Sequence, residues 1–217
     1  MKRTFALSFS LALLASASLV SVPVQAAHYN VDDSHSHVGF SIKHLVGIVK
    51  GEFKEFGGSF EFDKDKVEDT KGTFTAKTAS ISTNNPKRDE HLKSADFFDA
   101  KKFPEITLAN LKVEKKGDKF QAQGDLTMHG VTKPVTFDVE FGGTAKDPWG
   151  NTRAGFSATT KLARKDFGIV WNKSLDAGGV MLGEDVMLDI QVEAVEGPAK
   201  APESNNAKAG KEGKKKH

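Results

Sequence analysis

The sequence of 217 residues contains no cysteine, which excludes disulfide bonds as a source of stability and thiols as nucleophiles or metal ligands. Beyond its N-terminus it has no stretch that approaches the roughly 20 apolar residues of a membrane-spanning helix. The H-E-x-x-H motif of zinc proteases, the nucleophile elbow of hydrolases and the glycine-rich phosphate loop are also missing. Catalysis therefore has no argument in the sequence, and burial of a core must hold the fold.

Residues 1–26 have the pattern of a secretory signal peptide. Lys2 and Arg3 give a positive start, residues 5–20 are mostly Leu, Ala, Phe and Ser, and residues 24–26 (VQA) offer small side chains before a cleavage point. The apolar part is too short and too rich in serine for a membrane span. We therefore expect cleavage after Ala26 and a soluble, exported protein without stable membrane insertion.

The remaining chain is balanced in charge. The leader carries two of the 31 basic residues and none of the 29 acidic ones. Residues 197–217 hold six lysines and two glutamates, with no aliphatic side chain larger than alanine, so we expect a disordered lysine-rich tail. Residues 27–196 then form one domain with an excess of acidic residues, which lacks the basic footprint of a nucleic-acid binder.

Alternation with a period of two runs through this domain. Val38, Phe40 and Ile42 share one face, and His44 falls in phase with them, so that its imidazole would point inward. Glycines 57 and 58 predict a bulge or a sharp bend, and a phase change near Asn110 predicts a bulge. Roughly eight such segments with hairpin connections predict an all-β antiparallel meander. A sandwich or a barrel would fit, and the many inward phenylalanines and glycines favour a barrel with a cavity.

Residues 84–104 (NNPKRDEHLKSADFFDAKKFP) are the long stretch that cannot be a strand. A short helix near residues 86–100 is predicted, because Pro86 suits the first helical position and Asn84 or Asn85 can supply the N-cap oxygen. One interpretation is that this segment plugs one end of the β structure. The other is that Arg88, Asp89 and His91 add polar groups to the rim of an apolar pocket that holds an amphiphile. Both can hold together.

Two imidazoles, His35 and His37, flank Ser36 and lie on one side of an extended segment. With His28 or His91 they could complete a metal site. No cysteine ligand and no carboxylate at a diagnostic spacing accompany them. A histidine-dependent metal-binding protein or metalloenzyme is therefore the alternative hypothesis, and no cofactor or metal is predicted.

Several motifs occur together and in order over nearly all of the body: DSHSHVGF at 33–40, HL at 44–45, GEF at 51–53, FGG at 56–58, RDEHLKSADFFD at 88–99, FP at 103–104, GDLTMHGVTKPV at 124–135 and RKDFGI at 164–169. The set resembles the YceI-like family of polyisoprenoid-binding, lipocalin-like periplasmic proteins. The resemblance implies an eight-stranded antiparallel barrel whose apolar interior holds a long isoprenoid, isoprenoid quinone or similar lipid, often in a dimer. It implies transport, storage or sequestration of that ligand rather than an enzyme.

A lipid tail gains about 0.8 kcal/mol for each methylene that leaves water, whereas its head group needs polar partners. Arg88 and Arg164 are candidates because guanidinium offers paired donors, with Asp89, Asp166 and His44 to hold the arginines or the head group. Alternatively, these polar clusters pin the helix and the loop at 167–171 to the barrel. The predicted ligand-binding residues are Phe40, His44, Phe53, Arg88, Asp89, Leu92, Phe97, Phe98, Phe103, Arg164, Asp166, Phe167 and Trp171.

Overall fold

The computed structural model describes residues 26–117, 119–176 and 178–198. Residues 1–25 of the predicted leader and the predicted tail from residue 199 lie outside this part. No helix within the described residues is long and apolar enough to span a bilayer. The strands are β1 (Ala27–Val31), β2 (His37–His44), β3 (Gly47–Phe53), β4 (Phe56–Phe62), β5 (Lys71–Lys77), β6 (Ile81–Ser82), β7 (Glu105–Lys116), β8 (Lys119–Met128), β9 (Val131–Lys146), β10 (Thr152–Ala163) and β11 (Leu182–Glu196). The helices are α1 (Pro86–Lys93) and the 3-10 turns η1 (Asp33–His35), η2 (Val67–Asp69), η3 (Thr78–Ser80) and η4 (Arg164–Phe167).

The strands form one antiparallel barrel, which confirms the predicted fold class. Their order is β1-β4-β5-β7-β8-β9-β10-β11-β2-β3-β6, and pairing of β1 with β11 closes the ring. β1 and β2 share one edge of β11, since Tyr29 pairs with Glu196 and Val38 with Ile190. β3 and β4 share the next position in the same way, since β3 pairs with β2 and β4 pairs with β1. β5 and β6 share the position after that: β6 follows β5 through η3 and pairs with β3. The eleven segments therefore occupy eight strand positions.

The bulge predicted near Asn110 is present, and a bulge at Gly57 and Gly58 is not. The β7–β8 register shifts between Ala109 and Lys112, and Asn110 has a φ of 54°, as the phase change indicated. Gly57 and Gly58 instead stay in regular register with β5. A Cβ on Gly58 would lie 2.6 Å from the Thr73 carbonyl oxygen and 2.7 Å from a ring carbon of Phe74. This glycine therefore makes room for a neighbouring strand rather than for a bulge.

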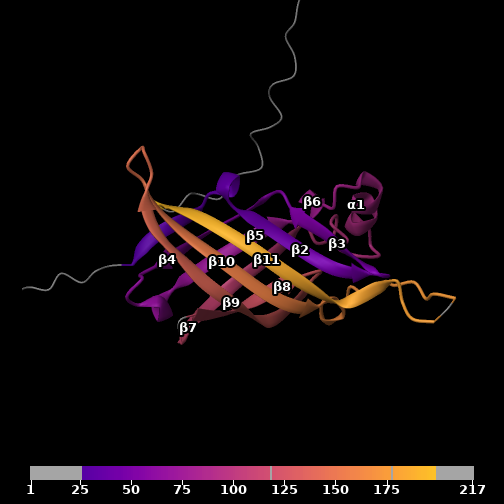
Figure 1. Ribbon diagram of the computed structural model, residues 1–217. Coiled ribbons are helices and arrows are strands. Elements are labelled where there is room, and N and C mark those ends of the chain that lie inside the picture. Colours follow the sequence, from indigo (N-terminus) through magenta and orange to yellow (C-terminus); the bar gives the residue numbers. More distant parts are fainter. Residues whose placement is uncertain (1–25, 118, 177, 199–217) are drawn as a thin grey trace, which may run out of the picture.

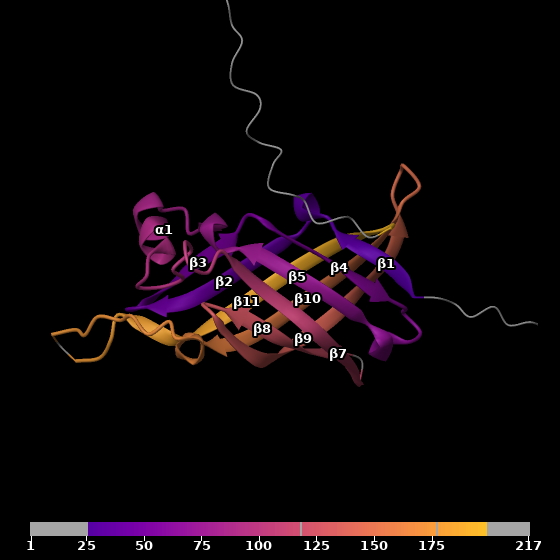
Figure 2. The same ribbon diagram turned by 180° about the vertical axis from the view of Figure 1, so that it is seen from behind.

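The helix begins as predicted and ends earlier. Asn85 is the N-cap, and its side chain accepts a hydrogen bond from the Arg88 N–H at 3.1 Å. Pro86 occupies the first turn, and Ser94 caps the C-terminus, so residues 94–103 continue as turns rather than as helix. α1 lies beside β6 and β3 at one end of the barrel, together with the β2–β3 turn and the loop before β11, whereas the β9–β10 hairpin lies at the other (Figures 1 and 2).

Apolar side chains fill the interior unevenly along the barrel. At the end away from α1, Tyr29, Phe60 and Phe62 form an aromatic cluster, and Val67 of η2 is buried against it. Leu126, Phe137 and their neighbours form a second cluster, which residues from the α1 segment join. The end away from α1 is thus closed by packed rings, and space remains between the clusters.

Candidate ligand-binding cavity

A cavity of about 650 Å³ runs inside the barrel, and its wall is almost entirely apolar. Phe40, Phe53 and Phe98 line it near α1, where the Phe40 and Phe53 rings lie 5.9 Å apart and the Phe53 and Phe98 rings 5.8 Å apart. Phe60 and Phe156 line it toward the closed end. A volume of this size is typical of a small-molecule site, and the apolar wall suits a hydrocarbon chain.

The lining residues that carry a charge or an imidazole all lie at the α1 end. They are His44, Lys87, Arg88, His91 and Arg164. His44 ends β2, the next three belong to α1, and Arg164 opens η4 directly after β10. The cavity is therefore polar at one end and apolar at the other, and we infer that the polar end is its mouth, because Lys87 in its lining is exposed to solvent.

Arg88 and Asp89 both form hydrogen bonds to a third residue, Thr83. Arg88 Nε donates to Thr83 Oγ1 at 2.7 Å, and its Nη2 donates to the Thr83 carbonyl at 2.9 Å. The Asp89 carboxylate accepts from Thr83 N–H at 2.8 Å and from the Thr83 hydroxyl at 2.5 Å. Asp89 is buried and lies outside the lining. It holds Thr83, which in turn positions the Arg88 guanidinium at the mouth.

Arg164 holds the loop between η4 and β11. Its Nε donates to the Gly183 carbonyl at 2.9 Å, and its Nη1 donates to the carbonyls of Ile169 at 2.9 Å and Trp171 at 2.7 Å. The predicted structural alternative, pinning of the loop at 167–171, is therefore realised. Burial lowers the pKa of Arg164 from its usual value, with Glu184 acting in the opposite sense.

One nitrogen of this guanidinium, Nη2, is buried and has no hydrogen-bond partner among the described residues. Arg164 is 4% exposed and lines the cavity. A buried donor without a partner costs free energy, and a cation beside an apolar cavity is satisfied best by an oxygen of a bound molecule. The side chain can therefore anchor the loop and receive a polar group at the same time.

The comparisons with known proteins agree with this geometry. The YceI-like domain matches residues 29–194. The chain belongs to the YceI-like family. A curated relative, the UPF0312 protein of Pseudomonas putida (strain F1), is 44% identical over 200 residues, which cover 90% of this chain and 98% of the relative.

Two solved structures extend the comparison. The Campylobacter jejuni YCEI protein is 40% identical, with a TM-score of 0.62 over 71% of this chain and 90% of that one. A polyisoprenoid binding domain from Saccharophagus degradans is 12% identical, with a TM-score of 0.57 over 80% of this chain and 100% of that one. The second likeness shows the shared fold alone.

Most of the residues predicted for a YceI-like site lie around the cavity. Those that line it are Phe40, His44, Phe53, Arg88, Leu92, Phe97, Phe98, Arg164 and Trp171. At the mouth the His91 ring lies 5.0 Å from both Phe97 and Trp171, edge-on to each. This contact joins α1 to the loop that Arg164 holds.

Asp89, Phe103, Asp166 and Phe167 do not line the cavity. Phe103 packs on the His129 ring at 4.8 Å, and Phe167 is 2% exposed within the core. Asp166 is exposed, 3.7 Å from Lys133 Nζ, and does not hold Arg164 as predicted, because residues two apart on a helical turn do not face each other.

Sequence reasoning missed Thr83 and Lys87 at the mouth, and most of the aromatic residues at the closed end. Thr83 precedes two asparagines that suggested only a helix cap. The closed-end residues carry a clearer signal, because Phe60, Phe62 and Phe156 fall on the apolar phase of their strands. Extending the inward phase of every strand to its end would have found them.

The histidines proposed for a metal do not converge. Among the described residues, the group of three potential ligands is Asp32, His35 and Glu193, without His28, His37 or His91. His37 Nδ1 instead lies 3.4 Å from Glu52 Oε2. His35 and His37 are separated because the chain passes from η1 into β2 between them. The prediction that His35 and His37 form a metal site with His28 or His91 is therefore wrong, because only His35 belongs to the group found among the described residues.

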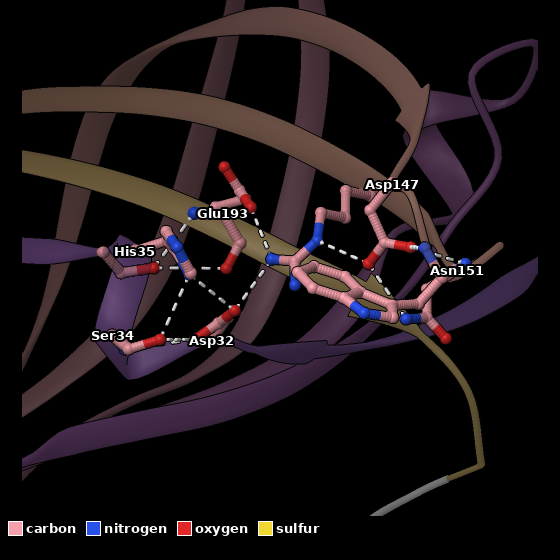
Figure 3. Close-up of polar contacts among 9 residues, drawn as sticks. Asp32, Ser34, His35, Asp147, Asn151 and Glu193 are labelled. Carbon is pink, nitrogen blue, oxygen red and sulfur yellow. Dashed lines mark hydrogen bonds and ion pairs between the residues drawn. The ribbon is translucent and has the colours of Figure 1, made fainter.

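A half-buried cation, Arg153, already pairs with two of these carboxylates, those of Asp32 and Glu193, whose positions are seen in Figure 3. Arg153 Nη1 lies 2.7 Å from Asp32 Oδ2 and 2.5 Å from Glu193 Oε1, and its Nε lies 3.1 Å from Asp147 Oδ2. Burial alone would raise the pKa of Asp32, but hydrogen bonds from Ser34, Arg153 and His35 hold it well below its usual value. The group is an ion-pair network that ties η1 to β10 and β11.

Proposed function

We propose that this protein binds one long-chain amphiphile, such as a polyisoprenoid or isoprenoid quinone, with the tail in the barrel and the head group at the α1 end. The observation that carries the proposal is the polarity of the cavity, apolar along its length and cationic at its mouth. The description of the Saccharophagus degradans domain as polyisoprenoid binding supports this choice of ligand.

The head group would meet the free Nη2 of Arg164 and the guanidinium of Arg88. Both present N–H donors to a phosphate, carbonyl or hydroxyl oxygen. Such a site fixes one end of the ligand and leaves the tail to gain about 0.8 kcal/mol per buried methylene. Binding would then tolerate tails of different length, as a carrier requires.

The setting that we propose is the periplasm, reached through the leader at residues 1–26, where the protein transports, stores or sequesters its ligand without catalysing a reaction. We further propose that it forms a homodimer. Both proposals rest on the sequence pattern and the family.

Native mass spectrometry of the mature protein purified from its own periplasm tests the proposal, followed by solvent extraction and identification of the released compound. We expect a stoichiometric long-chain lipid, and the same spectrum gives the oligomeric mass. A Phe98→Asp variant that keeps its fold should arrive empty, with Thr159→Phe on the outer face of β10 as the control. Protein that carries no lipid and does not bind added farnesol or geranylgeraniol would contradict the proposal.

A further inference from the structure

Five large apolar side chains stand exposed around the mouth of the cavity. This apolar rim consists of Leu45, Val46, Ile48, Val170 and Val180, and Val46 is 104% exposed. Leu45 N–H donates to the Met181 carbonyl at 2.9 Å, so the β2–β3 turn and the loop before β11 lie side by side. The two segments project together from the α1 end of the barrel (Figure 1).

The β2–β3 turn is unusual for its position. It has two residues, Leu45 and Val46, where the favoured sequences are Asn-Gly and Asp-Gly. Leu45 adopts a φ of 52°, which is uncommon for residues other than glycine, asparagine and aspartate. Packing within the barrel does not explain why an apolar residue occupies position 46, because Val46 is fully exposed. Apolar residues kept at a strained, solvated turn indicate a contact with something outside the barrel.

The charges around the rim favour an anionic partner. Lys43, Lys50, Lys87 and Lys173 are exposed, and none has an ion-pair partner among the described residues. Asp176 is the neighbouring exposed acid in the same loop. Apolar tips surrounded by lysines match the interface of an anionic bilayer, where the tips enter the acyl boundary and the ammonium groups meet the head groups.

The same elements carry the entrance. Val49 of β3, Met181 just before β11 and Leu182 at its start line the cavity, next to exposed Ile48 and Val180. A surface that touches the rim therefore faces the mouth directly. A lipid could pass between bilayer and cavity without crossing water.

We propose that the apolar rim docks the cavity mouth onto an anionic lipid surface, from which the ligand enters or into which it leaves. The inference rests on the proposed function for its purpose, but the docking contact can be measured on its own. The contact is peripheral, because the five rim residues belong to short segments, namely the β2–β3 turn with the start of β3 and the loop before β11.

Co-sedimentation of the full mature chain with vesicles tests the docking. Vesicles of phosphatidylethanolamine and phosphatidylglycerol should bind the protein more tightly than vesicles of phosphatidylcholine. Val46→Asn combined with Val180→Asn should weaken binding at least about tenfold, because the buried apolar area is lost. Lys43→Gln should weaken it about fivefold. Trp149→Ser is the matched control, since Trp149 is 81% exposed at the opposite end of the barrel, and it should bind as the wild type does.

Three results would overturn the docking: wild-type protein that ignores both kinds of vesicle, rim variants that bind as well as the wild type, or an equal loss in the Trp149 control. A dimer that the rim variant converts to monomer, without vesicle binding, would assign the rim to contact between copies of the chain. Lipid content by native mass spectrometry separates the two proposals. A rim variant that retains its lipid but loses vesicle binding supports both, and a docked protein with an empty cavity contradicts only the proposed function.

Discussion

Replacement of Ala158 by phenylalanine should shorten the cavity without closing its mouth. Ala158 lines the cavity on β10 and pairs with Val139 and Ile190, which also line it. Phenylalanine adds six carbon atoms to the side chain, and at about 0.8 kcal/mol per displaced methylene a long tail would lose up to about 5 kcal/mol of binding free energy. A short ligand that ends before this position should bind as it does to the wild type.

The assay is displacement of a fluorescent fatty acid by geraniol, farnesol and geranylgeraniol. In the wild type, affinity should rise about fourfold for each further carbon that is buried, and in Ala158→Phe the rise should stop about six carbons earlier. Thr159→Phe, on the exposed outer face of the same strand, controls for the added ring. An equal loss for all three alcohols, or no loss for the longest, would refute the placement of the tail, and a lower Tm would reveal overpacking of about 1–3 kcal/mol.

Three further predictions concern stability. Arg164→Met should lower the free energy of unfolding by about 3 kcal/mol or more in urea titrations, because three carbonyls lose a charged donor; a variant as stable as the wild type would exclude the anchoring role. Phe167→Asp should abolish folding as judged by circular dichroism, whereas Phe98→Asp should only empty the cavity; two equally unfolded variants would contradict the distinction between core and lining. Hydrogen bonds from Asn151 and Arg153 lower the pKa of Asp147 to about 2, so its stabilising contribution is complete above the unfolded pKa of about 3.9 and disappears as the pH falls toward 2. Asp147→Asn should flatten this acid transition, and an unchanged transition would show that Asp147 does not cause it.

The barrel could be predicted from the sequence because alternation reports which side chains face inward. Phe40, Ile42 and His44 follow the expected phase and all line the cavity. The shared strand positions could not be predicted, because alternation does not specify which neighbour a strand pairs with. β1 and β2 lie on one edge of β11 only through the register that closes the ring.

The partners of Arg164 were harder to assign, because they are backbone carbonyls up to 19 residues away in the sequence. Arg164 was paired in prediction with nearby Asp166, but its donors reach the carbonyls of Ile169, Trp171 and Gly183. Thr83 was missed for another reason: its partners are the side chains of Arg88 and Asp89, which the sequence suggested would pair with each other or with a head group. When a charged side chain bonds to backbone carbonyls, the sequence contains no oppositely charged residue from which that contact could be predicted.

The short strand β6 leaves the barrel wall weakly paired beside the mouth, so ligand exchange should be able to occur without unfolding of the barrel. β6 is only two residues long, and among the described residues it pairs in the sheet with β3 alone. The wall beyond it is completed by rings, with Trp171 5.1 Å from Phe97 and 5.0 Å from His91. Parting these rings breaks no strand pairing, so the mouth can open many times while the ladders from β7 to β11 stay intact. Amide hydrogen exchange should therefore be fast around α1 and slow in those long strands, under conditions in which the ligand exchanges.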